Sequence, residues 1–113
     1  MGYAKKTIFL KSDKVGDGEL GSMLVQGFLN AISQQGELPE SIIFVNSAIL
    51  LTTANENDDI TLVLKKLEKD GVNIYSCGTC LDYYNKRDAL KVGIPGNAKD
   101  TVKMLLMDDV VTF

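Results

Sequence analysis

Residues 41–47 read SIIFVNS, a continuous apolar run bounded by polar residues and preceded by Pro39. A run of this length is typical of a strand buried on both faces, as the central strands of a parallel sheet are. Parallel strands cannot be joined by tight turns and need longer crossover connections, which are usually helices. The flanking sequence is therefore expected to alternate strands with amphipathic helices.

The residues before this run follow that expectation. Residues 6–11, KTIFLK, predict a short strand. The turn-rich segment SDKVGDG leads into a helix that Asp17 can cap and that Gly36 can end. Apolar residues spaced by three and four positions predict the buried face of this helix: Leu20, Met23, Leu24, Phe28, Ala31 and Ile32.

The residues after the run continue the alternation. An irregular connection with room for one helical turn leads to a helix that Asn57 or Asp58 caps and Gly71 ends, with Ile60, Val63, Leu64 and Leu67 on its buried face. Residues 72–76, VNIYS, predict a third strand, and Cys77 follows at once.

The last third of the chain is read in the same way. Thr79 and Asp82 have the spacing of a helix-start capping box, ahead of a short helix or turn. LKVG predicts a very short strand, IPGN predicts a loop, and Asn97 is expected to cap a final helix. DVVTF predicts a closing strand.

Strand and helix thus alternate about five times, which predicts an α/β fold with a mainly parallel sheet and right-handed crossovers. The length of 113 residues fits a single domain, 1–113. Ligands of such sheets bind beyond the carboxyl ends of the strands, where the chain order reverses. We expect the loops 12–18, 46–53 and 77–82 to meet there.

Composition excludes several function classes. The net charge of −3 gives no basic footprint for nucleic acid, and no apolar run approaches the roughly 20 residues needed to span a bilayer. The N-terminal stretch MGYAKKTIFLKSD has only a three-residue apolar run before Lys11, so we expect no signal peptide and a cytoplasmic protein. Histidine is absent, which removes Cys–His and Ser–His–Asp catalysis and every histidine-ligated metal site within the chain.

Both cysteines lie in the stretch SCGTCL, as Cys77 and Cys80. They can be small buried residues, a redox pair, half of a metal site or a sulfur carrier. Their place at a strand end before a helix favours reactivity, because a helix N-terminus stabilises thiolate. Gly78 lets the backbone turn sharply and approach a ligand. Asp82 would disfavour the thiolate if it faced the sulfur.

Other chemistries fit the sequence less well. A zinc or iron–sulfur site needs about four protein ligands, and two cysteines without histidine do not supply them, so we expect no metal and no cofactor. Thioredoxin-like proteins usually carry Cys-x-x-Cys after an early strand, facing a cis-proline. Here the pair follows the third strand, and only Pro39 and Pro95 are available. Gly16, Gly18 and Gly21 match G-x-G-x-x-G, but Asp17 and Glu19 would place carboxylates beside a bound pyrophosphate.

Taken together, these motifs resemble the DsrE/DsrF-like superfamily of small sulfur-handling proteins. The marks are DGELGSMLVQGFL after the first strand, SIIFVNSAILLTT at the second and SCGTCLDYYN at the third, with LKVG before a terminal helix. More closely, the chain resembles the DsrE-like C-terminal domain of YedF-type selenium-metabolism proteins. Those proteins usually carry an N-terminal TusA-like domain as well, which these 113 residues do not include.

The resemblance implies a flavodoxin-like three-layer sandwich with five strands, and a homo-oligomer, often a trimer or hexamer. It also implies that Cys77 carries sulfur as a persulfide between donor and acceptor proteins, which can be TusA-like. Cys80 matches a position that is not cysteine in the sulfur relay relatives. The expected site is Cys77 and Cys80 as reacting groups, with Asn46, Ser47, Gly78 and Thr79 around the bound sulfur.

Two other functions stay open at this point. One is an oligomeric module that binds a small anion or nucleotide without chemistry, and the other is a Cys-x-x-Cys thiol–disulfide oxidoreductase. For the assembly, the apolar stretch NSAILLTT, 46–53, exceeds what one short strand end can bury. We therefore expect it to contribute to a subunit contact, because monomers rarely expose large apolar patches.

Overall fold

The five strands within residues 5–113 form one sheet, and all of them run parallel. The computed structural model describes residues 5–113. Residues 1–4 lie outside the described residues, although the predicted domain, 1–113, and the N-terminal stretch without a predicted signal peptide both begin there. The order across the sheet is β4-β3-β2-β1-β5. The strands are β1 (Lys6–Leu10), β2 (Ser41–Phe44), β3 (Asn73–Cys77), β4 (Ile94–Gly96) and β5 (Asp109–Thr112).

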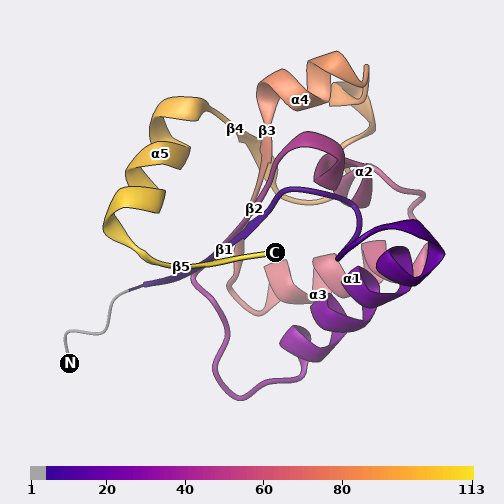
Figure 1. The fold of residues 1–113 in the computed structure, drawn as a ribbon, viewed down its shortest axis with the longest axis horizontal. Coiled ribbons are helices and arrows are strands. Elements are labelled where there is room, and N and C mark those ends of the chain that lie inside the picture. The colour runs from indigo at the N-terminus through magenta and orange to yellow at the C-terminus, as the bar shows by residue number, and fades with distance from the viewer. Residues whose placement is uncertain (1–4) are drawn as a thin grey trace.

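Helices connect these strands and cover both faces of the sheet. They are α1 (Gly18–Ser33), α2 (Ile49–Thr52), α3 (Asp59–Lys69), α4 (Gly78–Tyr83) and α5 (Ala98–Met107), with short 3-10 turns η1 (Asn46–Ala48) and η2 (Arg87–Ala89). Figure 1 shows α1 and α3 side by side on one face and α5 on the other. This arrangement confirms the predicted three-layer, flavodoxin-like α/β class.

The strand order explains the layers. The chain moves in one direction through β1, β2, β3 and β4, so the right-handed crossovers through α1 and α3 lie on the same face. After β4 it returns across the whole sheet to β5, and a right-handed crossover in the reverse direction puts α5 on the opposite face (Figure 1).

The main core lies between the sheet and the layer of α1 and α3. Alternate residues of the strands point into it, because neighbouring side chains on a strand face opposite sides. Buried side chains of the sheet, α1 and α3 form one cluster: Ile8, Leu10, Ile42, Phe44 and Ile74 from the strands, Val25 and Leu29 from α1, and Ile60, Leu64 and Leu67 from α3. Each such side chain contributes about 1.5–3 kcal/mol through removal from water.

Most predicted elements are confirmed within one or two residues at their ends, whereas β2 ends at Phe44, three residues before the predicted end at Ser47. The predicted strands correspond to β1, β2, β3 and β5, and the helices to α1, α3 and α5. Asp58 is the N-cap of α3, and Gly71, at φ +102, follows its end. The Asn97 side chain accepts a hydrogen bond from the Asp100 amide at 2.9 Å, as expected of the cap of α5.

The fourth strand was predicted in the wrong place. Residues 90–93 form no strand, whereas the predicted loop contains β4, which pairs Ile94 with Tyr75 and Gly96 with Cys77. Gly93, at φ +72, turns the chain into this strand, and a side chain there would collide with the Ile74 carbonyl. Pro95 is compatible with this strand, because β4 lies at the edge of the sheet, where proline is tolerated.

The buried face of α1 was also predicted wrongly. The residues that face the sheet are Gly21, Val25, Leu29 and Ser33, and the helix ends at Ser33, before Gly36. Leu20 and Met23 are each 65% exposed, and Leu24 and Phe28 are exposed as well. The helix is apolar on two sides, so residue spacing did not identify the buried one. Contacts with the preceding loop determine which side of α1 is buried. The Val15 amide donates to the Gly21 carbonyl at 3.0 Å, and a side chain at Gly21 would lie only 3.0–3.1 Å from atoms of this loop.

The stretch 46–53 does not expose the apolar surface expected of a subunit contact. Strand β2 ends at Phe44, and Asn46, at φ +54, turns the chain into η1 and α2. Ala48, Ile49 and Leu51 are then buried within the protomer and belong to its core. The premise for a contact at this stretch was therefore wrong.

Two leucines of α3 test the location of the core. Leu64 is fully buried, whereas Leu62 is 54% exposed on the same helix. Leu64→Ala should lower the free energy of unfolding by about 2–5 kcal/mol, because it leaves a cavity. Leu62→Ala removes the same atoms from a solvent-exposed position and should lower the free energy of unfolding by well under about 1 kcal/mol. Urea denaturation of both variants measures the difference, and equal losses would contradict the assigned face of α3.

Candidate functional site

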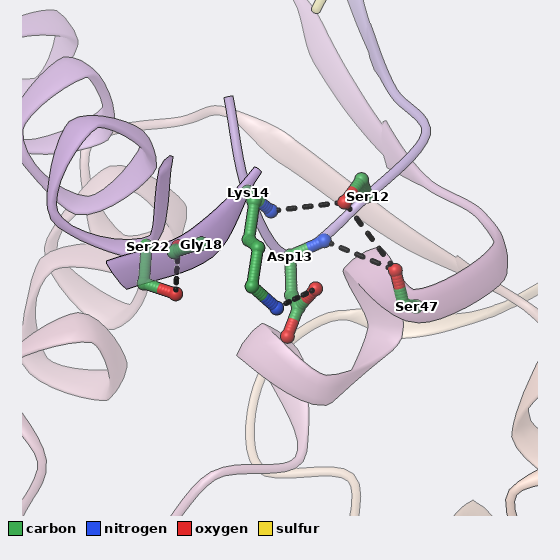
Figure 2. A network of polar contacts seen from close by, with 6 residues as sticks. All are labelled: Ser12, Asp13, Lys14, Gly18, Ser22 and Ser47. Atoms are coloured by element: carbon green, nitrogen blue, oxygen red, sulfur yellow. Dashed lines mark hydrogen bonds and ion pairs between the residues drawn. The ribbon is translucent and has the colours of Figure 1, made fainter. Parts of the chain in front are cut away.

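Three loops meet at the carboxyl edge of the sheet, as predicted. The middle loop, which follows β2, contacts the other two. On one side, the Ser47 hydroxyl accepts a hydrogen bond from the Asp13 amide at 3.2 Å and lies 3.5 Å from the Ser12 hydroxyl (Figure 2). On the other side, the Asn46 amide donates to the Cys80 sulfur at 3.1 Å. Residues 46 and 47 therefore tie the loop after β1 to the cysteines after β3.

The loop after β1 is stabilised mainly by its own contacts. The Lys14 amide donates to the Ser12 hydroxyl at 3.1 Å, and the Lys14 ammonium lies 3.3 Å from the Asp13 carboxylate (Figure 2). Gly16 and Gly18 have φ of +81 and +66, which favours glycine. With Gly21 packed against the loop, all three glycines of the G-x-G-x-x-G match have structural reasons that involve no dinucleotide.

The two cysteines lie at the junction of β3 and α4. Cys77 is both the last residue of β3 and the N-cap of α4, and Cys80 lies in the first turn of that helix. Both are free thiols that are partly exposed, and Cys77 lies close enough to influence the pKa of Cys80. Cys80 also packs against the main core, on the side of α1 and α3. Cys77 therefore lies at the strand end, whereas Cys80 is held against the core.

The environment distinguishes the two thiols electrostatically. Burial raises the pKa of Cys80, and the hydrogen bond to Cys77 and the charge of that neighbour raise it further, while the Asn46 amide acts in the opposite direction. The net effect raises the pKa of Cys80, so Cys80 stays in its protonated, less nucleophilic form over a wider pH range.

The predicted capping box at Thr79 is wrong. Cys77 occupies the N-cap, no side chain caps the helix there, and Thr79 lies inside the helix with its side chain exposed. Asp82 instead binds Arg87 in a two-pronged ion pair, with Nε at 2.7 Å and Nη2 at 3.1 Å from the two carboxylate oxygens. Arg87 lowers the pKa of Asp82. The negative charge that could have opposed a thiolate is thus paired.

Arg87 is a site residue that sequence reasoning missed. Besides Asp82, its Nη2 donates to the Gly78 carbonyl at 3.1 Å, so one guanidinium joins both ends of the cysteine-bearing helix. No sequence signal marks it, because a spacing of five residues is not a helical contact. A side chain at Gly78 would come within 3.0 Å of this guanidinium and 3.1 Å of the Gly96 carbonyl. Glycine is needed there for packing.

The topology places this junction at a switch point of the sheet. The connection that leaves β3 packs Leu81 into the core shared with α1 and α3. The connection that leaves β4 goes to the opposite face as α5 (Figure 1). Adjacent carboxyl ends whose connections diverge form the crevice in which α/β proteins bind ligands. Cys77 pairs with Gly96 at this point.

A cavity of about 660 Å³ lies elsewhere, between α5 and the second face of the sheet. Its lining residues include Ser41, Asn73, Tyr75, Thr101 and Met104. Gly96, which is the strand partner of Cys77, also lines this cavity. Neither cysteine lines it. Its size is that of small-molecule sites in general.

Within residues 5–113, no three side chains of the types that ligate metals (histidine, cysteine, aspartate and glutamate) gather in a way that could hold a metal ion. Within the same residues, no helix has both the length and the apolar character needed to cross a bilayer.

Comparison with known proteins identifies the fold. No protein-family model and no curated protein matches the sequence. Among solved structures, the ychN protein from E. coli superimposes with a TM-score of 0.72 at 19% identity, over 96% of this chain and 99% of that chain. A conserved protein of unknown function, BT1422 from Bacteroides thetaiotaomicron, gives a TM-score of 0.66 at 12% identity, over 96% and 95%. These matches support the DsrE-like fold, whereas the YedF-type assignment remains a prediction.

The order of thiol reactivity can be measured directly. Limited iodoacetamide labelling near neutral pH, followed by peptide mapping, should modify Cys77 first, because the pKa of Cys80 is raised and thiolate is the attacking species. Labelling of Cys80 should continue to accelerate at pH values above the ordinary thiol value of 9.0. In denaturant the two cysteines should label at similar rates. Faster native labelling of Cys80 would reverse the assignment.

The raised pKa of Cys80 also predicts how stability depends on pH. A thiol with a higher pKa in the folded than in the unfolded protein stabilises the fold below the unfolded value, and that contribution is lost as pH rises through the folded value. The stability of the wild type relative to Cys80→Ala should therefore fall as pH rises above about 9.0. Urea midpoints of both proteins from about pH 7 to about pH 10 measure this difference. A difference that grows with pH would contradict the direction of the shift.

Proposed function

We propose that this protein carries sulfur as a persulfide on Cys77. The observation that supports it most is the pair of thiols at the switch point, in which the environment of Cys80 favours its protonated form. A sulfur carrier needs one nucleophilic thiol at an open edge and a neighbour that does not compete for the incoming sulfur. The DsrE-like fold agrees with this role, although a fold alone does not specify a function.

The transfer follows ordinary thiol chemistry. The Cys77 thiolate attacks the outer sulfur of a donor persulfide, the sulfur–sulfur bond of the donor breaks, and the donor leaves as a thiolate. Cys77 then holds that sulfur as a persulfide. A thiolate of the acceptor attacks the same outer sulfur, the new bond at Cys77 breaks, and Cys77 returns as a thiolate. No oxidant or reductant is needed, because the sulfane sulfur only changes its partner.

Cys80 supplies a second route for release. Its thiolate can attack the Cys77 sulfur, displace the outer sulfur as hydrosulfide and leave a disulfide between Cys77 and Cys80. The contact between the two thiols supports this role, and the raised pKa of Cys80 makes the route slow near neutral pH. The carrier would therefore hold its sulfur until an acceptor arrives.

The remaining predicted residues have supporting roles in this proposal. The Asn46 amide, which donates to Cys80, is the nearest fixed donor for a sulfur anion from the second loop. Ser47 holds that loop through its contacts with the loop after β1. Thr79 is exposed beside the pair, where a partner protein can contact it. Gly78 permits the close packing that positions Cys77.

The partners proposed here rest on the family resemblance. They are a sulfur-donor and a sulfur-acceptor protein, which can be TusA-like, and the protein acts in the cytoplasm as a homo-oligomer, a trimer or a hexamer. A closer relation to YedF-type proteins would extend the cargo from sulfur to selenium.

A second function is supported by the cavity under α5. Its volume of about 660 Å³ suits a small molecule, and its lining combines apolar side chains with hydroxyl, amide and charged groups. This is the binding-module alternative. Native mass spectrometry of the isolated protein distinguishes the two functions, since a retained small molecule favours the module and an added sulfur atom on the Cys77 peptide favours the carrier.

Single-cysteine variants test the carrier function. Cys77→Ser should abolish sulfur loading from a cysteine desulfurase, because the accepting thiolate is gone. Cys80→Ser should still load and should hold its persulfide longer, because the displacing thiol is gone. Mass spectrometry of the cysteine peptide over time measures both effects.

Other results would overturn this assignment. If Cys77→Ser still loads, the carrier is not Cys77, and if neither variant changes loading, the protein is not a persulfide carrier. Rapid reduction of insulin in the presence of dithiothreitol would instead indicate a thiol–disulfide oxidoreductase.

A further inference from the structure

The two edges of the sheet differ in how they are protected. At one edge, β4 has only three residues and contains Pro95, which has no amide hydrogen to offer a further strand. At the other edge, β5 reads DVVT and has neither proline nor lysine. No strand within residues 5–113 pairs with its outer side. Edges of this second kind are usually blocked in soluble proteins, because they add further strands readily.

The backbone of β5 offers an outward set of hydrogen-bonding groups. The amides of Asp109 and Phe113 donate to carbonyls of the β1 side, at 2.9 Å each. Because successive residues of a strand direct these groups to opposite sides, Val111 also faces β1. Val110 and Thr112 therefore present their amide and carbonyl groups outward.

Apolar side chains flank this edge on both faces of the sheet. On the α1 side, the Phe28 ring lies 5.9 Å from the Phe113 ring, beside exposed Leu24. On the α5 side, the helix that leads into β5 exposes Val102, Leu106 and Met107. The one charge of the strand, Asp109, is paired with Lys6 at 2.6 Å. No unpaired charge of β5 itself keeps another strand away.

We propose that β5 pairs antiparallel with β5 of a second copy of this chain, across a twofold axis. Val111 would lie opposite its own copy, and Val110 would face Thr112 of the partner. Each of the two resulting pairs exchanges both of its backbone hydrogen bonds, as antiparallel strands do. The two five-stranded sheets then form one continuous sheet, and the flanking apolar side chains of α1 and α5 meet their own copies.

The structure favours a second copy over a foreign strand. A twofold pairing uses every outward group of the strand, and the same operation brings the exposed residues of α1 and α5 together, as an isologous contact requires. The shielded β4 edge prevents further growth, so the pairing closes at two copies. It is compatible with a hexamer, which contains twofold axes, and not with an isolated trimer. It does not depend on the proposed sulfur transfer.

The first test removes one outward amide. Thr112→Pro deletes a hydrogen bond to the partner while the ladder to β1, which uses the residues on either side, stays intact. Thr112→Val is the matched control, because it keeps the amide and the branched shape. By light scattering at micromolar concentration, the wild type and Thr112→Val should have an even number of copies. Thr112→Pro should show half that mass or less with an unchanged circular dichroism spectrum.

Two results would overturn the proposal at this stage. One is a wild type that is monomeric at that concentration, which would leave the edge for a different protein. The other is a folded Thr112→Pro that keeps the full mass, which would place the subunit contact elsewhere.

A second test identifies which residues of the two β5 strands lie opposite each other, and it does not require the proline variant to fold. In a background of Cys77→Ser and Cys80→Ser, Val111→Cys places two thiols across the twofold axis, with Cα atoms about 4.5 Å apart. That separation allows a disulfide, so mild oxidation should give a covalent dimer. Thr112→Cys is the control, since its copies would be about 7–8 Å apart on the diagonal, at or beyond the limit. Equal cross-linking of both variants, or none for Val111→Cys, contradicts the register.

Discussion

The structure depends on parallel pairing around β2, whose Ile42, Ile43 and Phe44 are completely shielded from water. A central strand of this kind must be covered on both faces, and parallel neighbours must be reached by crossovers. These requirements together produce α1 and α3 on one face and α5 on the other. They also bring the carboxyl ends of β1, β2 and β3 to a single edge, where residues distant in sequence become neighbours.

At that edge of the sheet, the two cysteine thiols lie in different environments. Cys77 and Cys80 are three residues apart, but one ends a strand and the other lies in a helical turn against the core. Burial and mutual contact raise the pKa of Cys80. Arg87 forms an ion pair with Asp82 and a hydrogen bond to the Gly78 carbonyl, so it contacts both ends of the helix that follows Cys77 and contains Cys80. This asymmetry between the two thiols is the basis of the sulfur transfer that we propose.

The cover of the sheet is uneven, and this shapes how the protein can interact. The face under α1 and α3 holds the main core, whereas α5 has no fully buried residue and leaves a cavity beneath it. Helix α1 turns one apolar side to the sheet and another to solvent. Through Phe28, which packs on Phe113, the exposed side of α1 adjoins β5, the unprotected edge of the sheet.

The sequence by itself determined the alternation of strands and helices, the parallel sheet and the position of the cysteines at a strand end, because these follow from local patterns such as SIIFV and from Asn97 and Asp58 as caps. It did not determine which apolar side of α1 is buried, that Ile94–Gly96 is a strand, or that Asp82 binds Arg87 rather than caps a helix. Only the tertiary structure decided these points. Each depends on a contact with a segment distant along the chain or around a turn, and periodicity carries no information about such contacts.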